Sequence, residues 1–282
     1  MIPGIAPKPA APPVAAAPQP RHMFVFGAGF VGRYVSERLL AQGWQVSGTC
    51  TSAVKKKELE MLGINASVFD ATESNLENIH SLQQATHLLI SIPPIPGIGD
   101  PLLHSNEDLR RILSHGNLEW LCYLSTTSVY GDCGGALVDE DALDTLAKSK
   151  SLSQRQKLRE SKQYTARIHV ADIYQAVLVS MSMRCARKIF NVVDDDPAPR
   201  AEVFAFARSL MEGRPDLITE TPGVNSTESD FQERIVPAEK RVSNARLKKE
   251  LGVKLLHPTY RSGLQSILDS WQAESQLRDR SR

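Results

Sequence analysis

The 282-residue sequence has no hydrophobic stretch of the roughly 18 to 20 residues that a membrane-spanning helix needs. Its cysteines, Cys50, Cys122, Cys133 and Cys185, include no C-x-x-C pair, which argues against a zinc site or a disulfide framework and fits a reducing compartment. An excess of one charge is also absent, because 33 Lys and Arg against 32 Asp and Glu leave +1. We therefore expect a soluble protein without a nucleic-acid partner, a membrane partner or a metal.

Composition changes sharply at the start of the chain. Thirteen of the first twenty residues are Pro or Ala. Proline lacks a backbone donor and fixes φ, so residues 1–21 are predicted to be a disordered leader. The alternative is a plastid transit peptide, although serine is absent from this segment. The expected location is the cytoplasm, and the plastid stays open.

Between residues 22 and 131, short apolar runs alternate with helical patterns. This rhythm predicts an α/β fold in which a doubly wound parallel, Rossmann-like sheet is interleaved with helices. The predicted strands are 23–26, 44–50, 66–69, 87–92 and 120–124, and the predicted helices are 31–42, 55–62 and 102–113.

After Gly131 the rhythm weakens. Residues 141–166 are rich in Lys, Arg, Gln and Ser and hold no apolar run suited to a buried strand. We expect a Rossmann domain over 22–140, a shortened polar connector over 141–166 and a small α/β substrate-side region over 167–282. In the last region, strands are predicted at 167–170 and 188–193, helices at 173–183, 200–211, 245–251 and 260–272, and a surface loop at 212–237.

A glycine-rich turn is the strongest chemical signal. Gly27-Ala28-Gly29-Phe30-Val31-Gly32 follows the first predicted strand and opens a helix. The first glycine allows a tight turn, the second lets a pyrophosphate approach the backbone, and the third lets the helix pack on the strand. The helix N-terminus adds amide donors and partial positive charge. This context favours dinucleotide binding over a purely structural turn.

Residues after the second and third strands bear on the cofactor. An NAD-selective site usually places Asp or Glu after the second strand, but this chain has Thr51 and nearby lysines at 55–57. Hydroxyls and lysines suit a 2′-phosphate, which modestly favours NADP over NAD; the alternative is that the lysines form the solvated face of the next helix. Asp70 suits the adenine amino group, or it is a turn residue or helix cap.

Hydroxyl side chains crowd the end of the fifth predicted strand, in Ser125-Thr126-Thr127-Ser128-Val129-Tyr130-Gly131. In open α/β sheets the ligand lies at the carboxyl ends of the strands. A hydroxyl there can bind a substrate carbonyl or alcohol while a partner moves the proton. Ordinary Ser/Thr turn chemistry is the alternative.

These motifs, with Arg167-Ile168-His169-Val170-Ala171-Asp172-Ile173 and Phe190-Asn191-Val192-Val193-Asp194, resemble the extended or atypical short-chain dehydrogenase/reductase superfamily and its NAD-dependent epimerase/dehydratase-like members. The resemblance covers roughly residues 22 to 270. It implies that the turn 27–32 binds the pyrophosphate, Asp70 the adenine, and Ser91 and Ile92 the nicotinamide side. It also implies that Thr126 is the catalytic hydroxyl, and His169 and Asp172 are interpreted as helix-start residues.

One departure weakens an enzymatic interpretation. The family places a Tyr-x-x-x-Lys pair after the Ser/Thr strand, where lysine lowers the tyrosine pKa. No tyrosine here is followed by lysine at that spacing, and the tract 140–167 is shorter than the family would have. Two hypotheses follow: an oxidoreductase or epimerase acting on a small, sugar-nucleotide-like substrate, or a non-catalytic dinucleotide-binding module or truncated isoform. A homodimer stays open.

Overall fold

The computed structural model describes residues 21–72, 76–95, 99–104, 106–131, 133–142, 164–183, 187–212 and 240–280. Residues 1–20 of the predicted leader (1–21), most of the predicted connector (141–166) and residues 213–237 of the predicted loop (212–237) lie outside these residues. The chain divides into two compact units. One comprises Met1–Gly27, Ser36–Leu89 and Pro94–Leu121, and the other comprises Ala28–Val35, Ile90–Pro93 and Cys122–Arg282.

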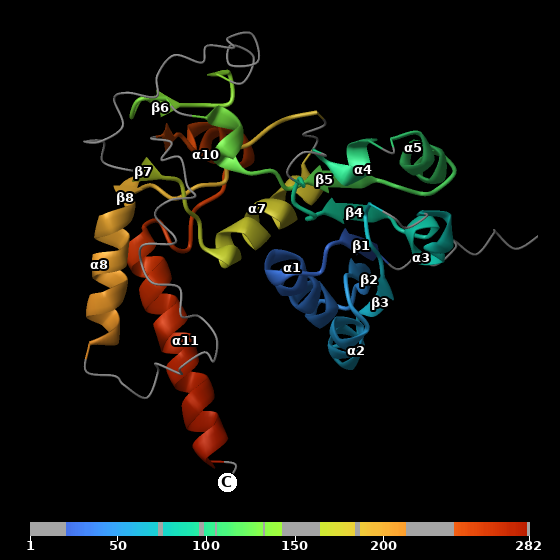
Figure 1. Cartoon of the computed structure of the whole chain (residues 1–282), viewed down its shortest axis with the longest axis horizontal. Helices are drawn as coiled ribbons and strands as arrows, with labels where there is room; N and C mark the ends of the chain where they lie inside the picture. Colours follow the sequence, from blue (N-terminus) through green and yellow to red (C-terminus); the bar gives the residue numbers. More distant parts are fainter. Residues whose placement is uncertain are drawn as a thin grey trace, which may run out of the picture. The chain divides into compact units, whose positions relative to one another are not determined.

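A parallel five-stranded sheet with the order β3-β2-β1-β4-β5 confirms the predicted α/β, Rossmann-like fold (Figure 1). The chain adds β2 and β3 on one side of β1 and then β4 and β5 on its other side, so the strand order changes direction at β1. Ligands bind at such switch points in open α/β sheets. The strands are β1 (His22–Phe26), β2 (Gln45–Cys50), β3 (Asn65–Val68), β4 (His87–Ile90) and β5 (Trp120–Tyr123).

The first strand is the centre of the core. Met23, Phe24, Val25 and Phe26 have no exposed surface, as expected for an apolar run buried on both faces of a parallel sheet. Parallel pairing with β2 sets Met23 opposite Val46. Because β2 pairs with β3 in the same direction, the carboxyl ends of all three strands lie at one edge.

The helices that follow β1 and β2 have local causes. In α1 (Phe30–Ala41), Val35 and Leu39 are fully buried, and the chain leaves the helix through Gly43 at a positive φ of 81°. The hydroxyl of Ser52 accepts from the Lys55 amide and caps α2 (Ala53–Met61), which lies beside β2 and β3 in Figure 1. Further along are η1 (Leu76–Asn78), α3 (His80–Gln83), α4 (Pro101–His104) and α5 (Asn106–Ser114).

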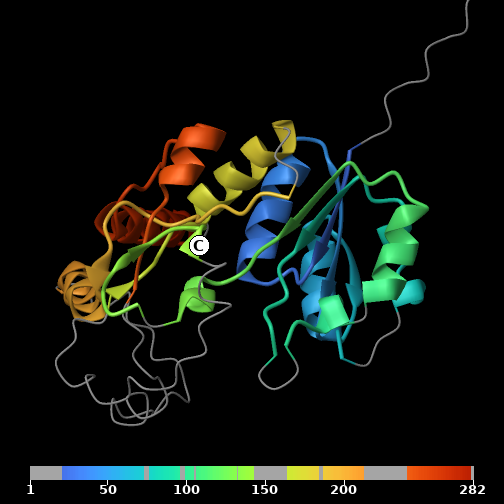
Figure 2. The same ribbon diagram turned by 90° about the horizontal axis from the view of Figure 1, so that it is seen from above.

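In its described residues, the second unit holds two small sheets and four longer helices. Figure 2 shows α7 beside α10, and the two contact each other around a cluster that includes the buried Ala176, Leu247 and Leu251. Its elements are η2 (Thr127–Tyr130), the parallel pair β6 (Leu137–Val138) and β9 (Arg241–Val242), the antiparallel pair β7 (Tyr164–Thr165) and β8 (Ala198–Pro199), α7 (Val170–Ser182), α8 (Arg200–Met211), α10 (Ala245–Leu251) and α11 (Tyr260–Arg280).

Two strand predictions in this unit are wrong. The segment 188–193 is not a strand, because the Asn191 amide donates to the Glu140 carboxylate instead of a neighbouring strand. The segment 167–170 is not a strand either, because the His169 ring accepts from the Ala171 amide and starts α7 at Val170. The predicted helices 200–211 and 245–251 are confirmed, and the tail helix runs further than predicted, to Arg280. None of the described helices is both long and apolar enough to cross a bilayer.

Candidate functional site

The glycine-rich turn joins β1 to α1. Gly27 has a positive φ of 84°, a conformation that favours glycine. Its amide donates a 2.9 Å hydrogen bond to the hydroxyl of Thr49, a buried residue of β2. The turn is therefore held against β2 by a side chain rather than by the sheet ladder.

The second glycine of the turn is open to solvent. A Cβ built on Gly29 would meet no described atom within 4 Å. The packing of the described residues therefore does not require glycine here, and the space is available to a ligand that approaches the backbone. Both observations fit the pyrophosphate of a dinucleotide.

The first turn of α1 suits an anion. A helix leaves the amides of its first turn outside its own hydrogen-bond ladder and carries partial positive charge there. That turn contains Phe30, Val31, Gly32 and Arg33 and no carboxylate. The Arg33 amide already bonds the Gly29 carbonyl, 2.8 Å away, so the helix begins directly after the open glycine.

Residues after β2 have partners within α2. Thr51 is exposed, and Ser52 caps the helix. The ammonium groups of Lys55 and Lys56 lie 3.9 Å and 3.6 Å from carboxylates one helical turn away. Exposed pairs of this kind are weak, at about 0.3–0.5 kcal/mol, so these lysines form a solvated helix face whose charge a 2′-phosphate could still attract.

Asp70 follows β3 at the same edge of the sheet as Gly27 and Thr51. Its carboxylate accepts from the Thr72 amide at 2.8 Å and from the Thr72 hydroxyl at 2.6 Å. These bonds, the hydroxyl's first, lower the pKa of Asp70. Asp70 therefore has the turn role that the sequence left open, and it presents an ionised, exposed carboxylate.

Thr126 lies just beyond β5. It caps η2, since its hydroxyl accepts from the Ser128 amide and donates to the Ser128 hydroxyl, both at 3.2 Å. A bond from the Leu124 amide to the Ile90 carbonyl, 2.9 Å long, joins the ends of β5 and β4. The half-buried Ser91 and Ile92 follow Ile90 directly. Residues 91–92 and 126 therefore follow neighbouring strand ends.

The tyrosine of the hydroxyl-rich segment lacks the environment of the missing Tyr-x-x-x-Lys acid/base. Tyr130, next to the hydroxyl-rich segment, is 2% exposed and donates to the Asn191 side chain at 2.8 Å. Burial raises the pKa of Tyr130. A buried phenol with a raised pKa is a structural donor.

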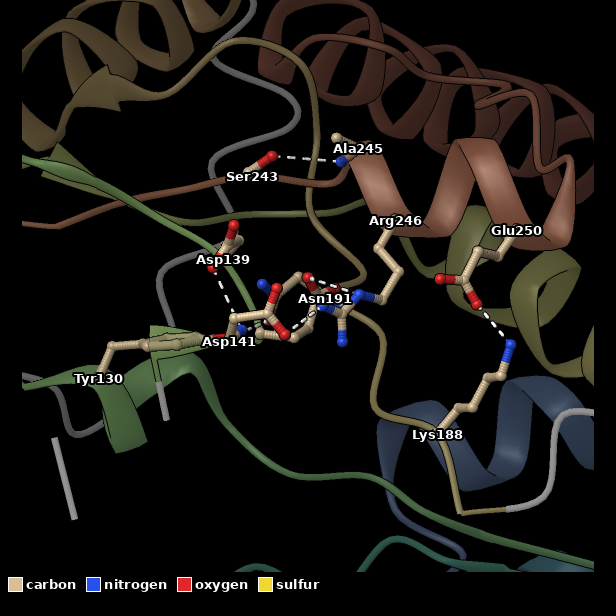
Figure 3. A network of polar contacts seen from close by, with 10 residues as sticks. Tyr130, Asp139, Asp141, Lys188, Asn191, Ser243, Ala245, Arg246 and Glu250 are labelled. Atoms are coloured by element: carbon tan, nitrogen blue, oxygen red, sulfur yellow. Dashed lines mark hydrogen bonds and ion pairs between the residues drawn. The ribbon is translucent and has the colours of Figure 1, made fainter. Parts of the chain in front are cut away.

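A polar network in the second unit was not foreseen from the sequence (Figure 3). The buried Glu140 accepts from the Asn191 amide at 2.6 Å, and its second oxygen lies 3.6 Å from Arg246, which also bonds Asp141 at 2.6 Å. The network joins the end of the η2 segment to α10. Its members are up to 116 positions apart in the chain, between Tyr130 and Arg246, so no local motif could reveal it.

Two cavities in the described part of the chain involve none of the site residues predicted from the sequence. One of about 400 Å³ is lined by Glu77, Gln83, Arg111, Ile112 and His115. The other, of about 270 Å³, is lined by Thr165, Arg167, Arg200, Val203 and Phe204.

No protein-family model and no curated protein sequence matches the chain. Among solved structures, a functionally unknown conserved protein from Silicibacter pomeroyi is 27% identical, with a TM-score of 0.65 over 89% of this chain and 99% of that one. Gre2 from Candida albicans, solved with NADPH, is 15% identical, with a TM-score of 0.57 over 87% and 97%. A UDP-N-acetylglucosamine 4-epimerase from Bacillus cereus is 14% identical, with a TM-score of 0.56 over 88% and 97%. The chain therefore shares the Rossmann fold of these solved structures.

Proposed function

We propose that the chain binds a nicotinamide dinucleotide at the turn 27–32 and transfers hydride to or from a small hydroxylated, sugar-nucleotide-like substrate. The observation that carries this proposal is the open backbone at Gly29, at the start of a helix whose first turn has no carboxylate. Similarity to Gre2, solved with NADPH, and to a UDP-N-acetylglucosamine 4-epimerase supports the same chemistry.

The residues fit such a cofactor. The turn 27–32 would hold the pyrophosphate on amide donors, Asp70 the adenine, and Ser91 and Ile92 the nicotinamide side. We propose NADP(H) over NAD(H), because Thr51 after β2 leaves no carboxylate there to select a ribose 2′-hydroxyl.

The bound cofactor supplies or accepts the hydride. Thr126 orients the reacting substrate oxygen, and for this its hydroxyl exchanges its bond to the Ser128 hydroxyl for one to the substrate. The bond that it accepts from the Ser128 amide keeps the oxygen in place during that exchange. In this proposal, 22–140 is the nucleotide-binding domain, 141–166 a shortened connector and 167–282 the substrate side.

The test is a fluorescence titration of the full chain with NADPH and with NADH. Gly29→Ala adds a methyl group that meets no described atom, so the protein should fold, while the methyl group occupies the space of the phosphates. We expect its dissociation constant for NADPH to rise about tenfold or more, since phosphate–amide bonds are charge-assisted. Gly263→Ala is the control, because its methyl group would make only ordinary contacts of 3.6 Å or more. Absence of binding to the folded wild-type chain would refute the proposal.

A second candidate is a dinucleotide-binding module without catalysis. The burial of Tyr130 and the absence of a Tyr-x-x-x-Lys pair favour it. The two candidates differ in turnover: a panel of sugar nucleotides, aldehydes and alcohols, followed by NADPH absorbance, should give turnover only for the enzyme. Cofactor binding without turnover on any member of the panel would favour the module.

A further inference from the structure

The smaller cavity lies in the second unit, where β7 and β8 meet the start of α8 (Figure 1). Antiparallel pairing sets Thr165 opposite Ala198. Two guanidinium groups, of Arg167 and Arg200, consequently line one cavity of about 270 Å³ although they are 33 positions apart in the chain.

Arg167 is incompletely bonded. Its Nη1 donates to the Ala198 carbonyl at 3.0 Å, but its Nη2 is buried and has no hydrogen-bond partner among the described residues. Burial lowers the pKa of Arg167, which reflects the cost of removing this charge from water. A buried donor without a partner costs stability, and an acceptor brought by a ligand would relieve that cost.

Arg200 is held over the ring of Phe204, at 5.1 Å from its centroid. Within the described ranges, no carboxylate lies at ion-pair distance from either guanidinium. Asp194 and Asp196 affect the pKa of Arg167 from further away. Because burial raises the pKa of Asp194 to about 7, that carboxyl is partly protonated near neutral pH and offsets only part of the positive charge.

We infer that this cavity binds an oxyanion, namely the phosphate or carboxylate end of a small molecule. Guanidinium groups bind such anions through parallel N–H bonds. Pro199, the N-cap of α8, makes no side-chain capping bond, so the positive end of this helix faces the same region, and the exposed Glu202 in its first turn offsets part of that charge. The volume is below the roughly 300–1,000 Å³ of sites for drug-sized ligands, which suits the charged end of a ligand. The inference does not depend on hydride transfer and goes beyond the proposed function.

The experiment measures thermal unfolding of the full chain in inorganic phosphate, in acetate and in chloride at equal ionic strength. Phosphate stabilises many proteins without binding a site, so variants must be compared. Arg200→Gln removes one guanidinium from the cavity. Arg208→Gln is the control, because it removes the same charge from the same helix about 12 Å further along.

For the wild-type chain and Arg208→Gln we expect a saturable rise of the unfolding temperature with phosphate, acetate or both. For Arg200→Gln the concentration giving half of that rise should increase about tenfold, as expected for loss of a charge-assisted bond. Arg167→Lys, which keeps the charge but not the planar donors, should weaken binding in the same way. If phosphate alone raises the unfolding temperature, the cavity binds the phosphate end of a ligand. If acetate raises it as well, the cavity also accepts carboxylates. A response that does not saturate, or equal loss in the Gln variants, overturns the inference.

Discussion

The backbone amide of Gly27 and the side-chain hydroxyl of Thr49 form a 2.9 Å hydrogen bond that ties the glycine turn to the neighbouring strand. Thr49 is 1% exposed, so its hydroxyl accepts this bond from within the sheet. The shape of the turn, and with it the proposed pyrophosphate site, therefore depends on one hydroxyl of β2.

Thr49→Val should weaken both stability and cofactor binding. The change removes the acceptor but keeps the shape, and loss of such a bond costs about 1–2 kcal/mol in the free energy of unfolding. The NADPH dissociation constant should rise because the turn loses its anchor. Urea unfolding and fluorescence titration measure the two effects. Thr49→Ser keeps the hydroxyl and should bind NADPH like the wild type; unchanged stability and NADPH affinity in Thr49→Val would show that the turn does not depend on this bond.

Thr126→Ala should abolish most turnover on any active substrate, by about 100-fold, while leaving NADPH affinity unchanged. The variant also loses an N-cap, which costs about 1 kcal/mol of stability. Thr126→Ser keeps both the cap and the hydroxyl and should restore turnover. Ser128→Ala separates the role of Thr126 from that of Ser128, because it removes the hydroxyl to which Thr126 donates. Turnover that survives in Ser128→Ala but not in Thr126→Ala assigns the reaction to Thr126. Equal turnover in Thr126→Ala and the wild type would exclude the catalytic role.

The first five strands and the glycine turn could be predicted because their causes are local. Met23 to Phe26 form an apolar run that suits a strand buried on both faces, and the glycines follow it directly. Helix ends were predictable for the same reason, since Gly43 adopts a positive φ after α1. Each of these features follows from a few neighbouring residues.

One of the two strand errors, and the missed cavity, arose where the partner is distant in the chain. The apolar residues of 188–193 suggested a strand, but the Asn191 amide bonds the Glu140 carboxylate, 51 positions away. The cavity with Arg167 and Arg200 was missed because it exists only once β7 pairs with β8. For Asp70 the sequence left two roles open, and the bonds to Thr72 supply the turn role.

Asp172→Asn should destabilise the second unit. Asp172 has no exposed surface, and its two carboxylate oxygens accept from the Leu256 and His257 amides at 2.5 Å and 3.1 Å. The side chain of Asn accepts through its one oxygen, and its NH2 group would face the other backbone N–H, so that two donors would meet. We therefore expect a loss of about 2–3 kcal/mol in the free energy of unfolding. Asp269→Asn is the control, because Asp269 is exposed on α11. Similar unfolding free energies for both variants would show that the loop 252–259 is held by other contacts.

Asp194 should make the protein less stable as the pH rises. Burial raises the pKa of its carboxyl from 3.8 to about 7, and the attraction of Arg167 offsets only part of this shift. Since the folded state holds the proton more tightly than the unfolded chain, stability is lost as the pH rises from the unfolded pKa to the folded one.

Asp194→Asn, which removes the charge but keeps an acceptor for the Asp196 amide, should therefore raise the free energy of unfolding at pH 8 by a few kcal/mol and change it little near pH 4. The neighbouring Asp195 provides a control of opposite sign. Burial acts to raise its pKa, but hydrogen bonds from Asn244 and Lys248 outweigh that effect and lower it. Asp195→Asn should then destabilise the protein at pH 8. Urea unfolding of both variants and the wild type at several pH values measures these differences. An Asp194→Asn protein that is less stable than the wild type at pH 8 would show that Arg167 needs the charged form of Asp194.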